Sequence, residues 1–262
     1  MQKIGFIGIG KMATAIIAGL DPTRFEILIS GRDFSKTQKQ AQELSAQAVT
    51  QRELVTKSDL IVLAVKPQVL PKVLTELSVD LTSDKTLVSI AAGLTLADLT
   101  ELTQTAHQPI IRVMPNINAQ IGQSTSAIVK NDFVTDQAYQ ATQEIFQAVG
   151  SVHEIAEKDF STFAAIAGSS PAFIYMFIDA LARAGVLHGL PKDKATKIVA
   201  ETVQASAEMI LQSGENPWSL VDKVSSPGGT TVAGVVSLEQ NHFIGTVIDA
   251  ITATVEKEKN LK

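Results

Sequence analysis

Short runs of consecutive apolar residues alternate with polar, helix-periodic segments through the first 155 residues. The runs are rich in Ile, Val and Leu on successive positions, which is typical of strands covered on both faces in a parallel sheet. Strands are predicted at residues 3–8, 26–30, 59–65, 85–92, 109–115 and 126–130, with helices between them such as 12–20 and 35–46. Strand–helix alternation with short connections predicts a right-handed, doubly wound α/β domain.

The strand pattern ends near residue 157. Residues 171–190 are apolar nearly all round and predict a buried helix, with Ser170 as N-cap and Pro171 at the first helical position. Further helices are predicted at 191–213 and about 242–257. We therefore expect two domains, 1–155 (α/β) and 156–262 (all-α). The helical half has several apolar faces, so we expect it to complete its core with a partner chain.

Composition narrows the class of protein. The chain has 262 residues, 45% of them hydrophobic, and a net charge of −5. This acidic balance gives no indication of a nucleic-acid or membrane-surface partner. Without cysteine there is neither a disulfide framework nor a thiolate metal site. No secretory signal and no uninterrupted run of about 18 apolar residues is found, so we expect a cytoplasmic protein.

The stretch GIGKMA, residues 8–13, follows the first predicted strand and opens a helix. Gly8 permits a tight turn, Gly10 lets the backbone approach a pyrophosphate, and Ala13 keeps the helix close to the sheet. In this context the motif predicts a Rossmann-type dinucleotide site rather than an ordinary glycine turn.

The end of the second predicted strand indicates which dinucleotide is bound. An acidic residue there would bond the ribose 2′-hydroxyl of NAD, but this strand ends in Ser30, Gly31 and Arg32. A hydroxyl and a guanidinium suit the 2′-phosphate of NADP. Asp33 complicates the prediction, because its carboxylate is also a possible partner for Arg32.

Two further strand ends carry small residues that leave room for a cofactor. These are AVKPQ (64–68) and AAG (91–93), and ligands in such sheets lie beyond the carboxyl ends of the strands. Lys66 is as consistent with a solvated loop lysine as with a ligand contact.

The helical half contains two Ser-Ser-Pro segments followed by small residues, GSSPA (168–172) and SSPGGTT (225–231). In the second, Ser226 is expected to cap a helix whose first turn contains Pro227 and both glycines. Open amides and two threonine hydroxyls at a helix start favour a carboxylate or phosphate. A plain capped helix is the alternative, although two glycines would weaken it by about 1 kcal/mol each.

The four histidines fall in no motif, and no His/Asp/Glu group has metal-ligand spacing. An alcohol or hydroxy-acid dehydrogenase needs a positioned base. A protonated imine needs less help, so the residues favour C=N reduction, without a metal.

The motifs FIGIGKMATAIIAG, LAVKPQ, SIAAG, RVMPN, AGSSPA, AGVLHGL and SPGGTT follow one another in the order seen in pyrroline-5-carboxylate reductases. The chain resembles this family over nearly its whole length. The resemblance implies an NADPH-binding Rossmann-type domain followed by a helical dimerisation domain. It also implies reduction of 1-pyrroline-5-carboxylate to L-proline, the last step of proline biosynthesis, and assembly as a dimer or a ring of dimers.

The resemblance also assigns site residues. For the cofactor it implies Ile7, Gly8, Ile9, Gly10, Lys11, Met12, Ser30, Arg32, Ala64, Val65, Lys66, Pro67, Ile90, Ala91, Ala92 and Gly93. For the substrate it implies Glu157, Ser169, Ser226, Gly228, Gly229, Thr230 and Thr231, with Thr231 at the ring nitrogen as the catalytic candidate. Where the family commonly has MPNTPA and SGSGPA, this chain has MPNINA (114–119) and AGSSPA (167–172), which leaves the contacts of Ser169 and Ser170 open.

Two other functions remain to be distinguished. One is a different NADP-linked reductase or β-hydroxyacid-type dehydrogenase, which would need a catalytic lysine in the second domain; Lys192, Lys194 and Lys197 cluster at a helix start with solvated spacing. The other is a non-catalytic NADP sensor, which would not need the open helix start at 226–231.

Overall fold

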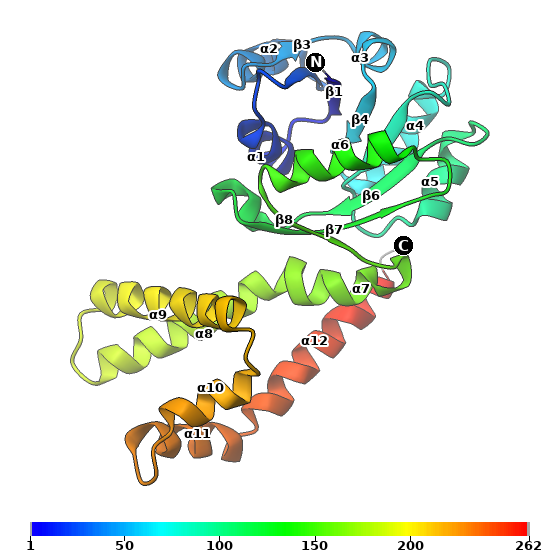
Figure 1. Cartoon of the computed structure of the whole chain (residues 1–262). Helices are drawn as coiled ribbons and strands as arrows, with labels where there is room; N and C mark the ends of the chain where they lie inside the picture. The colour runs from blue at the N-terminus through cyan, green and yellow to red at the C-terminus, as the bar shows by residue number, and fades with distance from the viewer. Residues whose placement is uncertain (1, 261–262) are drawn as a thin grey trace. The chain divides into compact units, whose positions relative to one another are not determined.

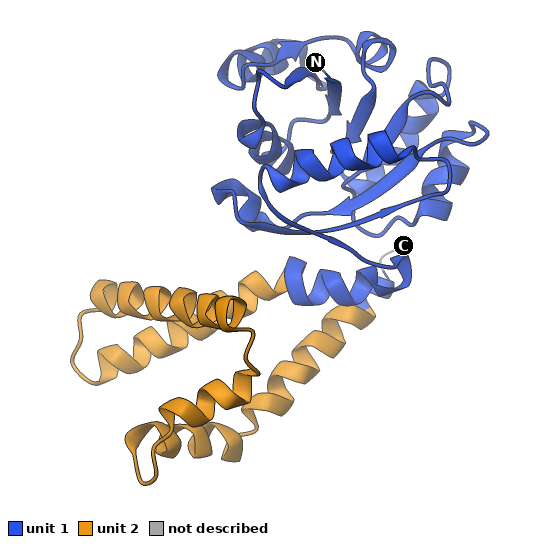
Figure 2. Cartoon of the chain, viewed as in Figure 1, with its two compact units in different colours: residues 1–168, 257–262 blue, residues 169–256 orange. Residues whose placement is uncertain are grey.

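The computed structural model describes residues 2–260, and the chain divides into two compact units (Figure 2). Unit 1 comprises residues 1–168 and 257–262, and unit 2 comprises residues 169–256.

Unit 1 is built on an eight-stranded sheet with the order β3-β2-β1-β4-β5-β6-β7-β8 (Figure 1). The strands are β1 Gln2–Ile7, β2 Phe25–Ser30, β3 Gln47–Ala48, β4 Leu60–Leu63, β5 Thr86–Ser89, β6 Ile110–Met114, β7 Ser124–Lys130 and β8 Gly150–Glu154. Neighbouring strands are parallel except for β6 and β7. The strand order reverses between β1 and β4, which is where doubly wound sheets bind ligands.

Helices cover both faces of this sheet (Figure 1). Their bounds are α1 Lys11–Gly19, α2 Phe34–Glu43, α3 Gln51–Lys57, α4 Leu70–Leu77, α5 Leu96–Thr103 and α6 Asp136–Gln147, with 3-10 turns η1 Pro67–Val69, η2 Ile117–Ile121 and η3 Glu157–Asp159. Alternate strand residues supply two cores: Leu60 and Val62 pack with α1 and α6, whereas Ile61 and Leu63 pack with α3, α4 and α5. Burial on both faces explains the unbroken apolar runs in the sequence.

The α/β prediction is confirmed, with two differences in the sheet. β7 runs antiparallel to β6, because the connection through η2 is shorter than the dozen or so residues that a parallel crossover needs. The edge strands β3 and β8 were not predicted. β8 is mostly exposed and carries only one large apolar residue, Val152, so its sequence lacks the buried-strand pattern.

Unit 2 is helical, as predicted. It contains α8 Ser170–Leu187, α9 Lys192–Ser213, α10 Pro217–Val224, α11 Thr230–Gln240 and α12 Phe243–Lys259, whose last residues belong to unit 1. Helical structure leads into α8 without a break, through α7 (Phe160–Phe163) and a π-helical turn (η4, Ala164–Ser169). The prediction that a new helix begins at Ser170 is therefore wrong. The wider turn precedes Pro171, whose ring would clash with an earlier carbonyl in a regular α-helix.

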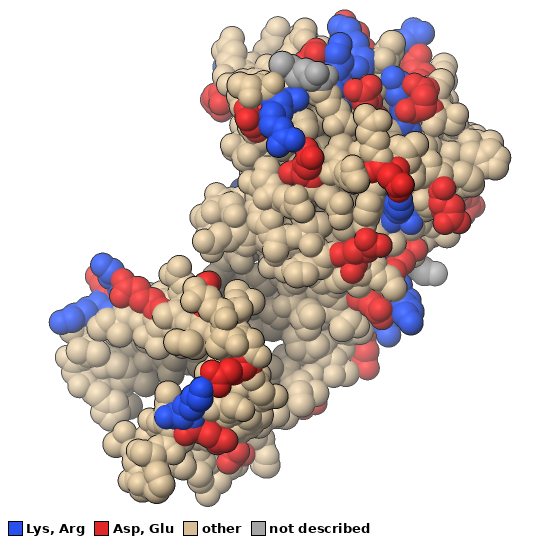
Figure 3. All heavy atoms as spheres, in the orientation of Figure 1, with Lys and Arg blue, Asp and Glu red and all other residues tan. Residues whose placement is uncertain are grey.

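Helix α8 is also not buried within the single chain. Only Pro171 and Ala182 of α8 are buried, and Met176 and Leu187 are 72% and 81% exposed. Among the described residues, one helical stretch, Glu157–Leu187, is long and apolar enough to span a bilayer by length and composition, and 17% of its apolar window is buried. The view in Figure 3 shows correspondingly few charged groups along much of unit 2.

Candidate functional site

Four parallel strands of unit 1 end at the same level. In the register, Ile7 lies opposite both Ser30 and Leu63, and Leu63 lies opposite Ser89. The segments that follow these residues therefore meet at one carboxyl edge of the sheet. All the residues that the sequence assigned to the cofactor lie in these segments, namely Ile7–Met12, Ser30 and Arg32, Ala64–Pro67, and Ile90–Gly93.

The first of these segments forms the predicted tight turn. Gly8 has a left-handed φ of +91°, and a Cβ there would lie 2.7 Å from Val65 Cγ1. Gly10 is the N-cap of α1, without a side-chain capping bond, and a Cβ on it would meet nothing within 4 Å. Ala13 is buried against the sheet. Gly10 thus borders open space in front of unbonded helix amides, an arrangement that accepts an anion such as a pyrophosphate.

The second segment places Ser30 and Arg32 one strand away. Ser30 is buried at the end of β2, and its carbonyl accepts a hydrogen bond from Gly8 N–H at 2.9 Å. Arg32 is exposed and has no ion-pair partner within residues 2–260. Asp33 instead caps α2, where its carboxylate accepts from Lys36 N–H at 3.0 Å. The competition between Asp33 and a ligand for Arg32, left open by the sequence, does not occur here.

The remaining two segments follow β4 and β5. Lys66 is exposed and is the N-cap residue of η1, without a side-chain capping bond. In the other segment, Gly93 has a φ of +76°, and Ala91 N–H donates to Ser89 Oγ at 3.3 Å. The left-handed glycine turns the chain back toward α5.

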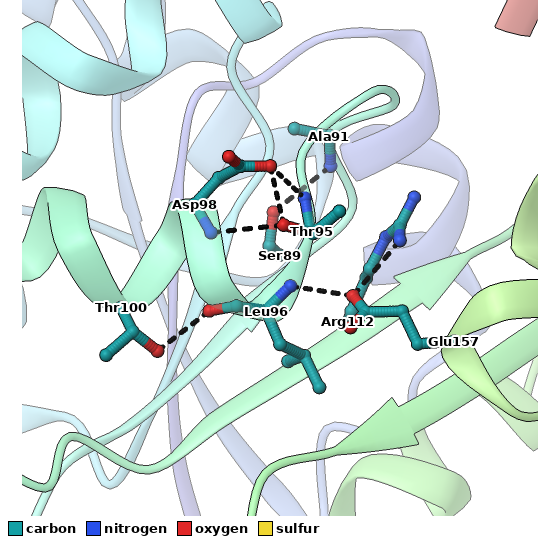
Figure 4. A network of polar contacts seen from close by, with 8 residues as sticks. All are labelled: Ser89, Ala91, Thr95, Leu96, Asp98, Thr100, Arg112 and Glu157. Carbon is teal, nitrogen blue, oxygen red and sulfur yellow. Dashed lines mark hydrogen bonds and ion pairs between the residues drawn. The ribbon is translucent and has the colours of Figure 1, made fainter. Parts of the chain in front are cut away.

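A polar network that the sequence did not predict lies beside the segment that follows β5 (Figure 4). The carboxylate oxygen Oε1 of Glu157 accepts from Leu96 N–H at 2.6 Å and from Arg112 Nη1 at 3.2 Å. Arg112 is nearly fully buried, and its guanidinium lies over the Phe160 ring at 4.4 Å. Burial lowers the pKa of Arg112, and the pairing with Glu157 opposes that shift. The resemblance assigned Glu157 to the substrate, but the structure bonds its carboxylate to Leu96 and Arg112. An arginine inside a buried strand was the only other signal of this network in the sequence.

Asn116, in the RVMPN motif, is a second residue without a predicted role. Its backbone N–H donates to Ser124 Oγ, and its Nδ2 donates to Ala167 O at 3.0 Å. Asn116 therefore ties the end of β6 to the π-helical turn. Its motif was noted in the sequence, but nothing in the spacing indicated this tertiary partner.

In unit 2 the SPGGTT segment has a different local structure from the predicted one. Residues 226–229 form a turn in which Gly229 N–H donates to Ser226 O at 2.9 Å, with Gly228 at φ +72°. Helix α11 begins at Thr230, with Gly229 as a bare N-cap. The two glycines thus precede the helix, because a turn with proline second and a left-handed third residue is of type II, and that third position favours glycine.

The correction leaves the open helix start intact. Thr230 and Thr231 occupy the first helical positions and are exposed. Ser169, half-buried, lies in the π-helical turn before α8. Within the described residues, no group of three or more His, Cys, Asp or Glu side chains is placed to hold a metal ion.

Comparisons with known proteins cover both parts of the chain. Residues 157–261 match the family model of pyrroline-5-carboxylate reductase dimerisation, and residues 3–93 match that of coenzyme F420-dependent NADP oxidoreductase. The chain is 38% identical to a pyrroline-5-carboxylate reductase of Escherichia coli, over 99% of this chain and 98% of the relative.

Comparison with solved structures indicates the same family. A 1-pyrroline-5-carboxylate reductase of Streptococcus pyogenes is similar with a TM-score of 0.89 and 42% identity, over 99% of this chain and 98% of that one. A Plasmodium falciparum pyrroline carboxylate reductase with NADP bound has a TM-score of 0.87 and 33% identity, over 99% and 97% of the two chains. The chain belongs to the pyrroline-5-carboxylate reductase family.

Proposed function

We propose that this protein reduces 1-pyrroline-5-carboxylate to L-proline with NADPH, the last step of proline biosynthesis. The observation that carries the proposal is similarity to enzymes of this name over both units of the chain, with 38% and 42% identity to two of them. The predicted absence of a histidine base is consistent with an imine substrate, which is already electrophilic when protonated.

The cofactor residues of the proposal are those at the carboxyl edge of the sheet. The amides at Ile7–Met12 hold the pyrophosphate, Ser30 and Arg32 bind the 2′-phosphate, and Ala64–Pro67 with Ile90–Gly93 flank the ribose and nicotinamide. The open space at Gly10 and the unpaired Arg32 support this assignment. When bound, NADPH supplies the hydride.

The substrate residues of the proposal lie mainly at the start of α11. The amides and hydroxyls of Ser226, Gly228, Gly229 and Thr230 bind the substrate carboxylate, because a helix N-terminus with a bare cap favours an anion. Thr231 orients the ring nitrogen and assists its protonation. Ser169 contributes a hydroxyl from the π-helical turn. Glu157, the remaining residue that the resemblance assigned to the substrate, is bonded to Leu96 and Arg112, and a different role is argued for it below.

The proposal includes self-association. The exposed apolar side chains of α8 fall within the region matched by the dimerisation family, so a second copy of the chain covers them, rather than a bilayer. We place the functional boundary between an NADP-binding part, 1–155, and a substrate-binding and dimerisation part, 156–262. The particle is a dimer or a ring of dimers, acts in the cytoplasm and has no nucleic-acid partner.

The deciding experiment follows the oxidation of NADPH and of NADH at 340 nm with 1-pyrroline-5-carboxylate, and light scattering gives the mass of the particle. We expect steady turnover that is faster with NADPH, and a mass of two chains or more. NADPH binding without turnover would favour a sensor. Turnover only with a 3-hydroxy acid and NADP would favour the β-hydroxyacid-type dehydrogenase.

A further inference from the structure

The pair formed by Arg112 and Glu157 joins two parts of unit 1 that are 45 residues apart in the chain. The arginine side chain is 7% exposed, and Glu157 is its only ion-pair partner within 4 Å among residues 2–260. Arg112 Nε is also buried, and it has no hydrogen-bond partner among these described residues. Removing the carboxylate would leave the buried guanidinium without an ion-pair partner, and removing the arginine would leave the carboxylate without its own. The position of each side chain therefore depends on the other.

The carboxylate in turn holds the segment between β5 and α5. The same oxygen that pairs with Arg112 accepts the backbone N–H of Leu96, the first residue of α5, at 2.6 Å (Figure 4). At its other end the segment is tied by Ala91 N–H to Ser89 Oγ. Between the two ties lie Ala92, which is exposed, and Gly93 at φ +76°.

The arginine itself has little freedom to move. It belongs to β6, where it lies opposite Ser89 of β5 in the register, and its guanidinium stacks on Phe160, a fully buried ring. Strand, ring and carboxylate therefore fix the guanidinium from three sides. Since Glu157 bonds both Arg112 and Leu96, the position of Leu96 is set relative to the sheet.

We propose that Arg112 and Glu157 are a positioning pair, which holds Ile90–Gly93 in place against the nicotinamide end of the cofactor. This inference rests on the proposed function, in which that segment flanks the nicotinamide. The adenosine 2′-phosphate half of the cofactor is assigned to the ends of β1 and β2, at Gly10, Ser30 and Arg32. Loss of the pair should therefore disturb the reacting end of the cofactor and leave the binding of the other end unchanged.

The test uses Arg112→Met, Glu157→Ala, the double variant and the conservative Glu157→Gln in the full chain. Measurements are kcat with NADPH and 1-pyrroline-5-carboxylate, and calorimetric Kd values for NADPH and for 2′,5′-ADP, a probe of the adenosine half. We expect kcat to fall about 10- to 100-fold, as a displacement of about 1 Å in a reacting group does. NADPH should bind more weakly, and the Kd of 2′,5′-ADP should not change.

Two comparisons separate a positioning role from a general loss of structure. The double variant should be no worse than the poorer single variant, because the two side chains act as one unit. Glu157→Gln should recover part of kcat, since its amide oxygen still accepts Leu96 N–H. The control is Glu144→Gln, which breaks another Arg–Glu pair, with Arg24 at 2.7 Å, among exposed side chains; its kcat should equal that of the wild type.

Several results would overturn the inference. If Glu157→Ala raised only the KM for the substrate, Glu157 would contact substrate directly. If the variants lost thermal stability while kcat per cofactor-binding site stayed at the wild-type value, the pair would be purely structural. If Arg112→Met does not fold, the comparison of Glu157→Ala with Glu157→Gln still tests the positioning role. A wild type without turnover would refute the proposed function, and the ratio of the NADPH and 2′,5′-ADP Kd values would then test the pair separately.

Discussion

Replacing Gly10 by alanine should separate cofactor binding from stability. A Cβ at this position meets no atom within 4 Å, and the φ of −87° with ψ of 178° is open to any residue. Alanine has fewer conformations than glycine in the unfolded chain, which stabilises the folded variant by about 0.4–1 kcal/mol. Alanine is also a poorer N-cap residue than glycine, which destabilises it by a similar amount. The two effects offset, so the Tm should stay within about 4 °C of the wild-type value.

Cofactor binding should respond much more strongly. The added methyl group lies where the pyrophosphate must approach the amides of α1, so at least one hydrogen bond to a charged oxygen is lost. Such a bond contributes about 1.5–3 kcal/mol, which corresponds to about a 10- to 150-fold increase in the Kd for NADPH. Calorimetry of the Gly10→Ala variant, with Tm read at one fixed protein concentration, measures both quantities.

Gly8→Ala is the matched comparison, because the same substitution two residues earlier faces protein atoms. Its Cβ would lie 2.7 Å from Val65 Cγ1 and 2.9 Å from Ala64 O, at a left-handed φ. Strain and overpacking together should cost about 2–5 kcal/mol of unfolding free energy. If Gly10→Ala bound NADPH as tightly as the wild type, the pyrophosphate would not lie at α1, and the cofactor assignment would be refuted.

Three other perturbations test separate parts of the molecule. Arg32→Ala should raise the KM for NADPH by about 10-fold or more, the loss of one charge-assisted bond, with little effect on NADH; equal effects on the two cofactors would argue against a 2′-phosphate site. Thr231→Ala should lower kcat about 10- to 100-fold if the hydroxyl assists proton transfer, while NADPH affinity is retained; wild-type kinetics would exclude a chemical role. Burial raises the pKa of Tyr139 from 10.0 to about 12, so its folded state favours the neutral phenol, and the stability it contributes is present below pH 10 and lost as the pH rises toward 12. Tyr139→Phe should therefore flatten the fall in unfolding free energy across this range in urea titrations.

The doubly wound part of the fold was predictable because its strands are buried on both faces. β4, with the sequence LIVL, is buried at every position, so its composition alone marks it as a strand. β3 and β8 were missed for the opposite reason: they lie at the edges of the sheet and, apart from Val152, carry polar or small residues. The hydrophobic pattern also could not predict the direction of each strand, because the antiparallel pairing of β6 and β7 follows only from the length of their connection.

The candidate site shows the same division. Gly8 and Gly10 were predictable because local backbone geometry demands glycine, or leaves space for a ligand, within one short motif. The Arg112–Glu157 pair was not, because it depends on tertiary contact across 45 residues. The glycines of SPGGTT were assigned to the wrong side of the helix start, since proline satisfies both a first helical turn and the second position of a reverse turn.

Unit 2 has a fold whose helices are predictable and whose core is not contained in one chain. Across residues 169–256, all of which the structure describes, only Pro171, Ala182 and Ala195 are buried, whereas a stable helical unit needs long apolar side chains in its core. Those side chains are present, Met176 and Leu187 among them, but they are exposed. The free energy that orders these helices must therefore come largely from association. The several apolar faces in the sequence led to the expectation of a partner chain, and the match of residues 157–261 to a dimerisation family supports a second copy as that partner.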